Sequence, residues 1–193
     1  MQEGRNGVTS NTPKNVLFGA GTIHKGLKYE GTEWNFAATC IGATNGGSKL
    51  SIVPELTDVP VDGANVLVKG LKVKTGETAT MEINMAELTE ELIKSATLAK
   101  YGTSEDATFN LIAPKADIEE GDYFENIAFV GVTLEGKKVI AILENALCTS
   151  GFEQEGKSKE GAVGKYTFTC HADLEAENLD TLPWKIYYPK PKV

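Results

Sequence analysis

The sequence contains few of the residue types that build most active sites, and no run that would anchor it in a membrane. Its 193 residues include two histidines and three cysteines, Cys40, Cys148 and Cys170. Three widely spaced cysteines are too few for a disulfide framework, which favours a chain that keeps its thiols reduced. No stretch approaches the ~20 apolar residues of a membrane-spanning helix, and the N-terminal MQEGRNGVTSNTPKN lacks the apolar core of a secretory signal. We therefore expect a soluble, cytosolic protein that contacts no membrane.

Positive charge is also scarce. The chain has 19 Lys and Arg side chains against 27 Asp and Glu, a formal net charge of −8, whereas a protein that grips nucleic acid needs clustered cations for phosphate contacts. Residues 61–130 alone hold six basic and thirteen acidic side chains, a net charge of −7. This segment forms either a solvated surface that aids solubility or an acidic face that repels another anion.

No segment matches a motif that carries chemistry. The Gly-Ala-Gly at residues 19–21 lacks the third glycine of a dinucleotide-binding turn, and residues 45–49 contain Gly-Ser-Lys where a phosphate loop has Gly-Lys-Ser. In the acidic run at 117–125 the glycine falls at position five, which departs from the calcium-binding loop. Cys170 and His171 are adjacent in a predicted strand, so their side chains point to opposite faces and cannot act as a pair. We predict no catalytic residue, no cofactor and no metal site.

Segments rich in glycine, proline and polar residues mark the ends of the chain and one long interruption. Residues 1–24 are predicted to form an N-terminal arm, and residues 185–193 a C-terminal strand or arm that ends in PKPKV. The remaining residues, 25–184, form a single domain. Within it, residues 42–63 surround one short alternating piece with Gly, Asn, Ser, Pro and Asp, and are predicted to be a loop. A compact domain seldom carries a loop of ~20 residues unless that loop has a function.

Alternating apolar residues predict several strands. The clearest hairpin pairs residues 126–134 with 138–147, and both strands are apolar on both faces, which predicts that both faces are covered. Residues 66–74 and 77–85 resemble a second hairpin that turns at Thr-Gly. Further strands are predicted at 32–40, 165–174 and 185–188.

One helix is predicted at about residues 85–98, with either Asn84 or Thr89 as its N-terminal cap. Its apolar side chains recur at helical spacing; they are Leu88, Leu92, Ile93 and Ala96. Short strands, many turns and one helix predict a mainly β protein with one flanking α-helix (α+β), built as an antiparallel β-sandwich or barrel.

Two long segments and the C-terminal end together resemble a known family. The strings IGATNGGSKLSIVPELTDVPVDGANVLVKGLKV and ATMEINMAELTEELIKSA, with LPWKIYYPK near the end, resemble the major tail proteins of long, non-contractile-tailed phages. The resemblance covers residues 32–147 most closely. It implies a β-sandwich or barrel of the tail-tube type with extended N- and C-terminal arms. Such subunits assemble as homo-hexameric rings that stack into a hollow tube in the tail of the virion.

The resemblance also implies partners and a passage. The rings would contact other tail proteins, namely the tape measure, the tail terminator and the distal tail protein. DNA would leave the capsid through the lumen without specific binding, and no cofactor would be needed. An acidic chain agrees with this role, because a negative wall does not hold phosphate groups. Assembly would take place in the cytoplasm of the host.

Two sets of residues are predicted to serve such an assembly. The long loop is expected to contact neighbouring subunits, through Thr44, Asn45, Gly46, Gly47, Ser48, Lys49, Pro54 and Asp58. The strand at 77–85 is expected to face the lumen with the side that carries Thr78, Thr80 and Glu82. These three alternate with Ala79, Met81 and Ile83, which would point the other way.

Three other functions are consistent with the sequence. A tube protein of a contractile tail or of a bacterial secretion apparatus would share the architecture. A surface carbohydrate-binding or adhesion β-sandwich would use an exposed Trp34 or Trp184 to stack on a sugar ring. The third is an enzyme, but no group of residues in the sequence indicates an active site.

Overall fold

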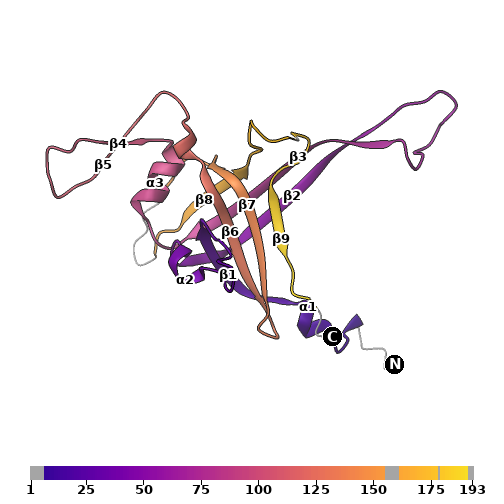
Figure 1. Ribbon diagram of the computed structural model, residues 1–193, viewed down its shortest axis with the longest axis horizontal. Helices are drawn as coiled ribbons and strands as arrows, with labels where there is room; N and C mark the ends of the chain where they lie inside the picture. Colours follow the sequence, from indigo (N-terminus) through magenta and orange to yellow (C-terminus); the bar gives the residue numbers. More distant parts are fainter. Residues whose placement is uncertain (1–6, 155–160, 178, 191–193) are drawn as a thin grey trace.

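The computed structural model describes residues 7–154, 161–177 and 179–190, and in these the chain is mainly β (Figure 1). Among the described residues, six strands form an antiparallel sheet and a seventh strand pairs with one of them. The order is β1 (Leu17–Lys25), β6 (Phe124–Thr133), β7 (Lys138–Cys148), β8 (Gly164–Cys170), β3 (Lys72–Met85) and β2 (Thr44–Asp58), with β9 (Trp184–Tyr187) paired to β7. The predicted mainly β, antiparallel class is confirmed.

Short elements surround this sheet. They are α1 (Thr12–Asn15), α2 (Phe36–Thr39), α3 (Glu90–Thr97), the 3-10 turn η2 (Glu120–Asp122), and a two-stranded sheet of β4 (Lys100–Gly102) and β5 (Leu111–Ala113). The β4–β5 segment extends from the end of the molecule that carries α3, whereas β2 and β3 run out at the opposite end (Figure 1).

The strand β7 is divided between two neighbours along one of its edges. Residues 140–143 pair with β9, and residues 146–148 pair with β8. Asn145 lies between the two stretches with φ 47°, a left-handed conformation that asparagine tolerates better than most residues. The strands β1 and β2, at the two ends of the order, lie close to each other without forming a ladder. The sheet therefore curls on itself.

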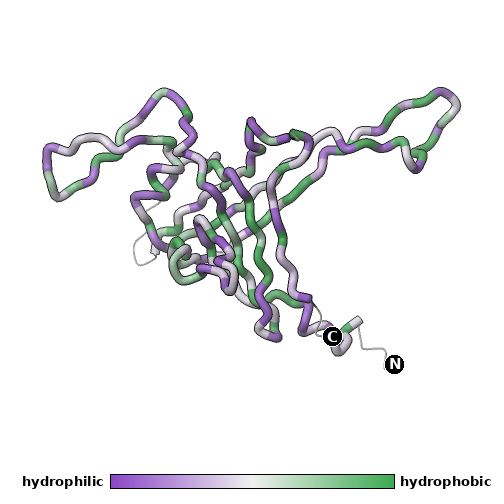
Figure 2. Tube along the Cα trace, viewed as in Figure 1, coloured by the Kyte–Doolittle hydropathy of each residue, from purple (hydrophilic) through white to green (hydrophobic). Residues whose placement is uncertain are grey.

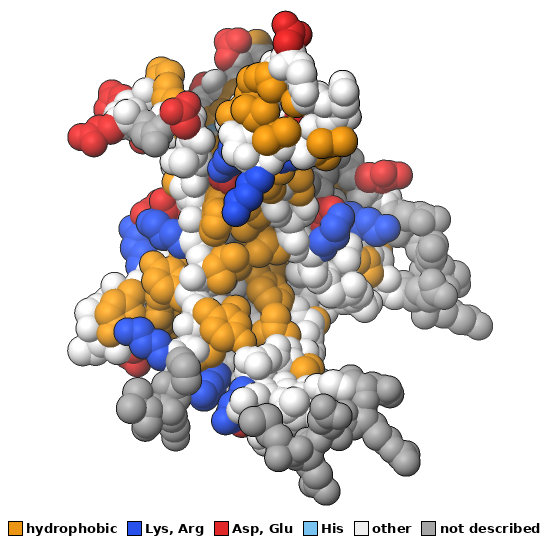
Figure 3. Space-filling model, turned by 90° about the vertical axis from the view of Figure 1, so that its right-hand side faces the viewer, with side chains coloured by type: hydrophobic (Ala, Val, Ile, Leu, Met, Phe, Trp, Pro, Cys, Tyr) orange, Lys and Arg blue, Asp and Glu red, His pale blue; other side chains and the backbone are white. Residues whose placement is uncertain are grey.

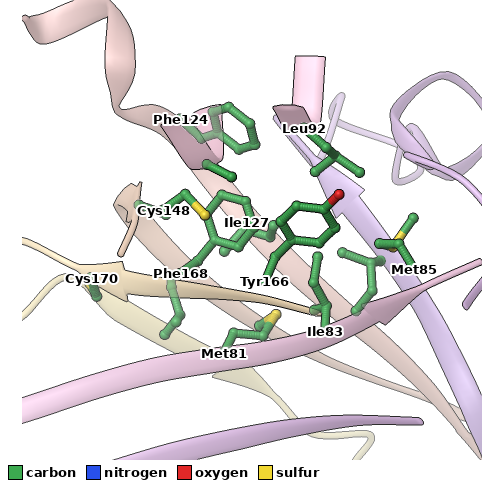
Figure 4. Packing of buried hydrophobic residues seen from close by; sticks show 14 of the residues in the cluster. Met81, Ile83, Met85, Leu92, Phe124, Ile127, Cys148, Tyr166, Phe168 and Cys170 are labelled. Atoms are coloured by element: carbon green, nitrogen blue, oxygen red, sulfur yellow. The ribbon is translucent and has the colours of Figure 1, made fainter. Parts of the chain in front are cut away.

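The main core fills the space between the curled sheet and α3. Figure 4 shows the rings of Tyr166 and Phe168 in its centre, with Met81 on one side and Leu92 and Phe124 on the other. The ring centroids of Phe124 and Phe168 are 5.1 Å apart. All five side chains are at most 5% exposed. Burying a side chain of this size contributes about 1.5–3 kcal/mol, so this cluster supplies the main stabilisation of the fold.

A second cluster covers the opposite face of the β6–β7 hairpin. Its buried members are Leu27, Ala128, Val130, Ile140 and Ile142. The rings of Trp34 and Phe36 pack over them from the segment before β2, and the Trp34 ring also contacts Tyr187 of β9 at 4.9 Å between centroids. The prediction that both faces of this hairpin are covered is confirmed.

The flanking helix is shorter than predicted and begins at the second of the two caps. Thr89 precedes α3, and its Oγ1 accepts a hydrogen bond from the Leu92 N–H at 3.4 Å. Leu92 and Ala96 face the core, but Leu88 lies outside the helix and is 52% exposed. The apolar stripe therefore starts one turn later than the sequence spacing indicated.

Residues 42–63, predicted to be a loop, are mostly strand. β2 extends from residue 44 to residue 58 and pairs along its length with β3. Pro54 is tolerated because β2 is the last strand of the order, and an edge strand accepts a residue that cannot donate to a ladder. Gly46 and Gly47, with φ 93° and 81°, lie where the β2–β3 register shifts, a place where a left-handed backbone favours glycine.

Three other sequence predictions are also wrong. The chain does not turn at Thr75-Gly76. A register shift in β2 opposite these two residues lets β3 continue through them, and the chain reverses in residues 59–71 instead. Residues 32–40 contain α2 instead of a strand. Residues 17–24 are not an arm, because they pair with β6 as β1.

The predicted strand at 165–174 ends at Cys170, and Leu174 is 89% exposed. The predicted C-terminal strand is present as β9, one residue earlier than expected.

The glycines that resembled part of a dinucleotide-binding turn form a bulge in β1. The register with β6 shifts between Phe18 and Thr22, and Gly21 within this stretch has φ 70°. A Cβ at Gly21 would stand 2.4 Å from a ring carbon of Phe129 and 2.9 Å from the Val130 carbonyl oxygen. Glycine is therefore required here both by conformation and by the close approach of the Phe129 ring.

We expect Gly21→Ala to destabilise the protein by about 2–4 kcal/mol, since left-handed strain and the clash with Phe129 add. Gly19→Ala is the matched control. Gly19 has φ 86° but nothing within 4 Å of its Cβ position, so only the strain of about 1–2 kcal/mol should remain. Urea unfolding of both variants measures the difference, and equal losses would show that the Phe129 contact does not matter.

Candidate assembly surfaces

The strands β2 and β3 leave the body of the protein as a two-stranded arm, which we define as residues 53–78. β3 pairs with β8 only from Thr80 to Met85, so its first half has β2 as its sole partner strand among the described residues. The arm projects far beyond the rest of the sheet (Figure 1). An isolated hairpin of two strands is at best marginally stable in water, so the arm depends on side-chain contacts or on a partner.

Ion pairs and one indole hydrogen bond support the arm. Lys72 pairs with Asp58 at 2.7 Å, and Lys74 pairs with Glu77 at 2.6 Å. The Trp184 Nε1–H donates to Glu77 Oε1 at 2.7 Å, which ties the base of the arm to β9. The Lys74 ammonium, followed by the Trp184 indole, lowers the pKa of Glu77.

The tip of the arm, residues 59–71, is apolar and exposed. Figure 2 shows hydrophobic stretches along it. Val66 and Leu67 are each 78% exposed, and the charged side chains of the tip, Asp62 and Lys69, cancel. The other exposed large apolar side chains of the tip are Val59, Val61 and Val68. Exposed apolar patches of this kind mark interaction surfaces on soluble proteins.

The residues predicted to face a lumen lie together on the outward side of the sheet. Thr78 and Glu82 are exposed and Thr80 is half-buried, while Ala79, Met81 and Ile83 between them are at most 1% exposed. The predicted alternation is therefore confirmed, and the position of these residues at a lumen stays a prediction.

The same outward face extends onto β2 and β8, where it carries hydroxyl groups and charges of both signs. Glu82 pairs with Lys49 at 2.8 Å, and Thr169 on β8 lies opposite Thr80. Its Oγ1 is 2.9 Å from that of Thr149. Lys165, opposite Asn84 on the same strand pair, is exposed next to this row. The acidic excess of residues 61–130 therefore does not accumulate on this face.

The residues predicted to form a contact loop fall into two groups. Residues 44–49 lie at the base of β2, where the register with β3 holds them beside the body, and the Asn84 amide donates to the Gly47 carbonyl at 3.0 Å. Removing these residues would take away the β2 partner of the end of β3. Pro54 and Asp58 lie on the arm, so the exposed part of the predicted segment is the arm and not its base.

A cavity that the sequence did not reveal opens between β1, β2, β7 and β9. This cavity, named the β1/β2 slot, has a volume of about 300 Å³. It is lined by Leu17, Ser48, Lys49, Leu50, Met81, Phe129, Val139, Ala141 and Ile186. The buried Oγ of Ser48 has no hydrogen-bond partner among the described residues. Nothing in the sequence indicated the slot, because strands distant in the chain bring its walls together.

The acidic run at 117–125 is partly buried. Asp122 is 4% exposed and pairs with Lys115 at 2.5 Å. Burial raises the pKa of Asp122, but the Glu119 backbone N–H and the Lys115 ammonium outweigh burial, so the net shift is downward. These contacts fix the segment beside η2, and they fit a structural role.

Burial raises the pKa of both buried cysteines, Cys148 and Cys170. The pKa of Cys170 rises to about 12, and its Sγ donates to the Glu144 carbonyl at 3.1 Å. Within residues 7–154, 161–177 and 179–190, no group of three or more His, Cys, Asp or Glu side chains is placed to hold a metal ion. In the same ranges, no helix is long and apolar enough to cross a membrane.

Comparison of the chain with protein-family models finds no matching family, and comparison with curated proteins finds no match.

His24, predicted to lie in an exposed arm, is buried under α2. It is 2% exposed, with Nε2 2.8 Å from Thr22 Oγ1 and Nδ1 3.0 Å from Thr39 Oγ1. The Thr39 hydroxyl donates to the Asn35 carbonyl at 2.9 Å, so Nδ1–H must be the donor to Thr39, and Nε2 accepts from Thr22. Burial first, and then the positive charge of Lys138, lower the pKa of His24 against an opposing hydrogen bond to the Phe36 backbone. The ring is therefore held neutral.

We expect this buried imidazole to make stability fall in mild acid. Because the pKa of His24 is lower in the folded chain than the ordinary 6.5, its contribution is complete above pH 6.5 and is lost as pH falls from there through the lowered pKa. Urea midpoints of the wild type should drop between pH 7.5 and 5.5. His24→Gln, which cannot titrate, should drop less over the same interval, and parallel profiles would contradict the assignment.

Proposed function

We propose that this protein is a structural subunit of a phage tail tube, and that its copies form hexameric rings that stack around a channel for DNA. The observation that carries the proposal is the arm, which projects beyond the sheet with Val66 and Leu67 78% exposed at its tip. A monomer gains nothing from this apolar surface, whereas a subunit of an assembly can cover it against a neighbour. The family resemblance of the sequence supports the same function.

The outward face of β2, β3 and β8 is suited to line a channel. Its hydroxyl groups and the Lys49–Glu82 pair offer phosphate groups no cluster of unpaired cations, so DNA can pass without being retained. In such a tube, Thr78, Thr80 and Glu82 face the lumen. The tape measure, the tail terminator and the distal tail protein remain the proposed partners, and the virion tail is the proposed location.

The alternative functions differ in how well the described contacts support them. A contractile-tail or secretion tube would use the same surfaces, and imaging of the complete particle distinguishes it. A carbohydrate-binding site needs an exposed indole. Trp34 is half-buried and packs on Phe36 and Tyr187, and the half-buried Trp184 bonds Glu77. No observation favours this function or an enzyme.

We expect purified protein at high concentration to form tubes with a central hole. Negative-stain electron microscopy of a concentration series tests this, because stacked rings give end-on views with a stain-filled centre. Solid filaments, or particles that stay monomeric at every concentration, would contradict the proposed tube.

The charge of the channel is tested with Glu82→Lys. This substitution replaces the Lys49–Glu82 ion pair by two neighbouring cations in every subunit. Because an exposed ion pair contributes only about 0–1 kcal/mol, the variant should fold and assemble. Its tubes should retain short double-stranded DNA at low salt and release it as salt rises. Glu82→Gln tubes are the control and should retain much less. If Glu82→Lys tubes retain no more DNA than the wild type, Glu82 does not face the lumen.

A further inference from the structure

The dipeptide Asn45-Gly46 lies in a bulge near the start of β2. We propose that Asn45 is a site of spontaneous covalent modification, at which the folded chain loses ammonia and gains an aspartyl or isoaspartyl residue. The proposal concerns the chemistry of a single chain, so it does not depend on the proposed tube.

Three residues of β2 share one partner residue at the bulge. Thr44 lies opposite Met85 and Ser48 lies opposite Ile83, so residues 45–47 face Asn84 alone. A bulge of this kind interrupts the ladder and leaves extra backbone groups unpaired. The backbone of residues 45–47 is therefore less restrained than that of a regular strand, and local opening there meets little resistance.

Gly46 places little steric hindrance next to the Asn45 amide. It has no Cβ, and a Cβ at this position would meet no atom closer than the Asn84 Nδ2 at 3.6 Å, which is an ordinary contact. Gly46 has φ 93° and Gly47 has φ 81°, left-handed conformations that favour glycine. The fold itself therefore requires, directly after Asn45, the residue type that hinders attack by its own backbone nitrogen least.

The Asn45 side chain is available for the reaction. Asn45 is exposed, and its amide makes no hydrogen bond with another described residue. By contrast, the Asn84 amide is engaged, because its Nδ2 donates to the Gly46 and Gly47 carbonyls at 3.4 Å and 3.0 Å. No side-chain hydrogen bond to a described residue has to break before the Asn45 amide turns toward the Gly46 nitrogen.

The reaction needs water and no cofactor. The Gly46 nitrogen gives its proton to solvent base and attacks the Asn45 Cγ. A carbon–nitrogen bond forms, and the side-chain nitrogen takes up a proton and leaves as ammonia. Water then opens the resulting cyclic imide at either of its two carbonyl carbons. One opening gives aspartate, and the other gives isoaspartate, in which the main chain runs through Cβ and Cγ. Either product adds one negative charge to the chain.

The site is remote from the tip of the arm. Figure 3 views the molecule from the side on which the arm projects, where hydrophobic side chains gather with Lys and Arg side chains beside them. β2 begins at Thr44 and extends to Asp58 on the arm, so Asn45 lies at the opposite end of this strand. Modification therefore leaves the tip unchanged and alters the base of β2, where isoaspartate would displace the carbonyls that Asn84 holds.

The test compares the folded wild-type chain with the same chain in urea, both incubated in dilute, mildly alkaline solution. Tryptic mapping by mass spectrometry follows the peptide of residues 29–49, in which Asn35 precedes Phe36 and serves as an internal control. We expect Asn45 to convert in the folded chain at a rate within about tenfold of its rate in urea, because the bulge gives little protection. Asn35 should stay unmodified, since the Phe36 side chain hinders attack.

Two variants complete the experiment. Asn45→Gln is the matched control: its longer side chain would have to close a larger ring, so residue 45 should stay unmodified. Asn45→Asp marks where a chain with the added charge elutes from an anion exchanger before any incubation. Conversion in the folded chain more than about tenfold slower than in urea would overturn the proposal. So would a product that contains aspartate without isoaspartate, which indicates direct hydrolysis, or a chain that converts in neither state.

Discussion

β7 gives one edge to β6 and shares its other edge between β9 and β8. Because Asn145 interrupts the second edge, β8 can pair only with the end of β7 before it continues the sheet toward β3 and β2. β8 is short, so it pairs with the last six residues of β3 and leaves the rest of that strand to β2 alone. The curl of the sheet and the projecting arm both follow from this division.

The same division separates a well-packed body from the arm, which lacks packing of its own. The body buries two faces of the β6–β7 hairpin and closes its main core with α3. The arm has no second layer among the described residues, and its cross-strand pair Lys72–Asp58 is half-exposed, where such pairs contribute little. Local opening should therefore be easiest in the arm, since few buried contacts oppose it. Covering the tip in an assembly would supply the burial that the isolated chain lacks.

The acidic side chains of residues 61–130 do not gather on the outward face of β3, although β3 belongs to this segment. Residues 61–130 carry most of the negative excess. However, much of the acidic charge lies on α3 and near η2, where Glu90 and Glu91 occupy the first helical turn and Asp122 pairs with Lys115. On β3 itself, Glu77 and Glu82 each have a lysine partner. A channel lined by β3 would thus be hydroxyl-rich and nearly neutral, which disfavours phosphate retention without requiring repulsion.

Local patterns determined several elements without tertiary information. The β6–β7 hairpin is visible as two apolar runs around Glu-Gly, and the alternation of Ala79, Met81 and Ile83 with polar neighbours assigns the two faces of β3. The sequence leaves the start of α3 open between Asn84 and Thr89, and the structure selects Thr89, whose hydroxyl accepts a hydrogen bond from the Leu92 N–H. Each of these signals arises from neighbours in sequence, so it survives whatever the rest of the chain does.

Long-range pairing decided the remainder. The glycines and prolines of residues 42–63 indicate a loop when considered alone, yet a ladder to β3 holds them as an edge strand in which Pro54 and two left-handed glycines are tolerated. His24 became a buried, neutral imidazole only when α2 covered it. The β1/β2 slot lies between strands up to about 170 residues apart in the chain, so no local pattern could contain it. Sequence periodicity reports which face of a strand is apolar, but only the assembled sheet determines which strand lies beside it.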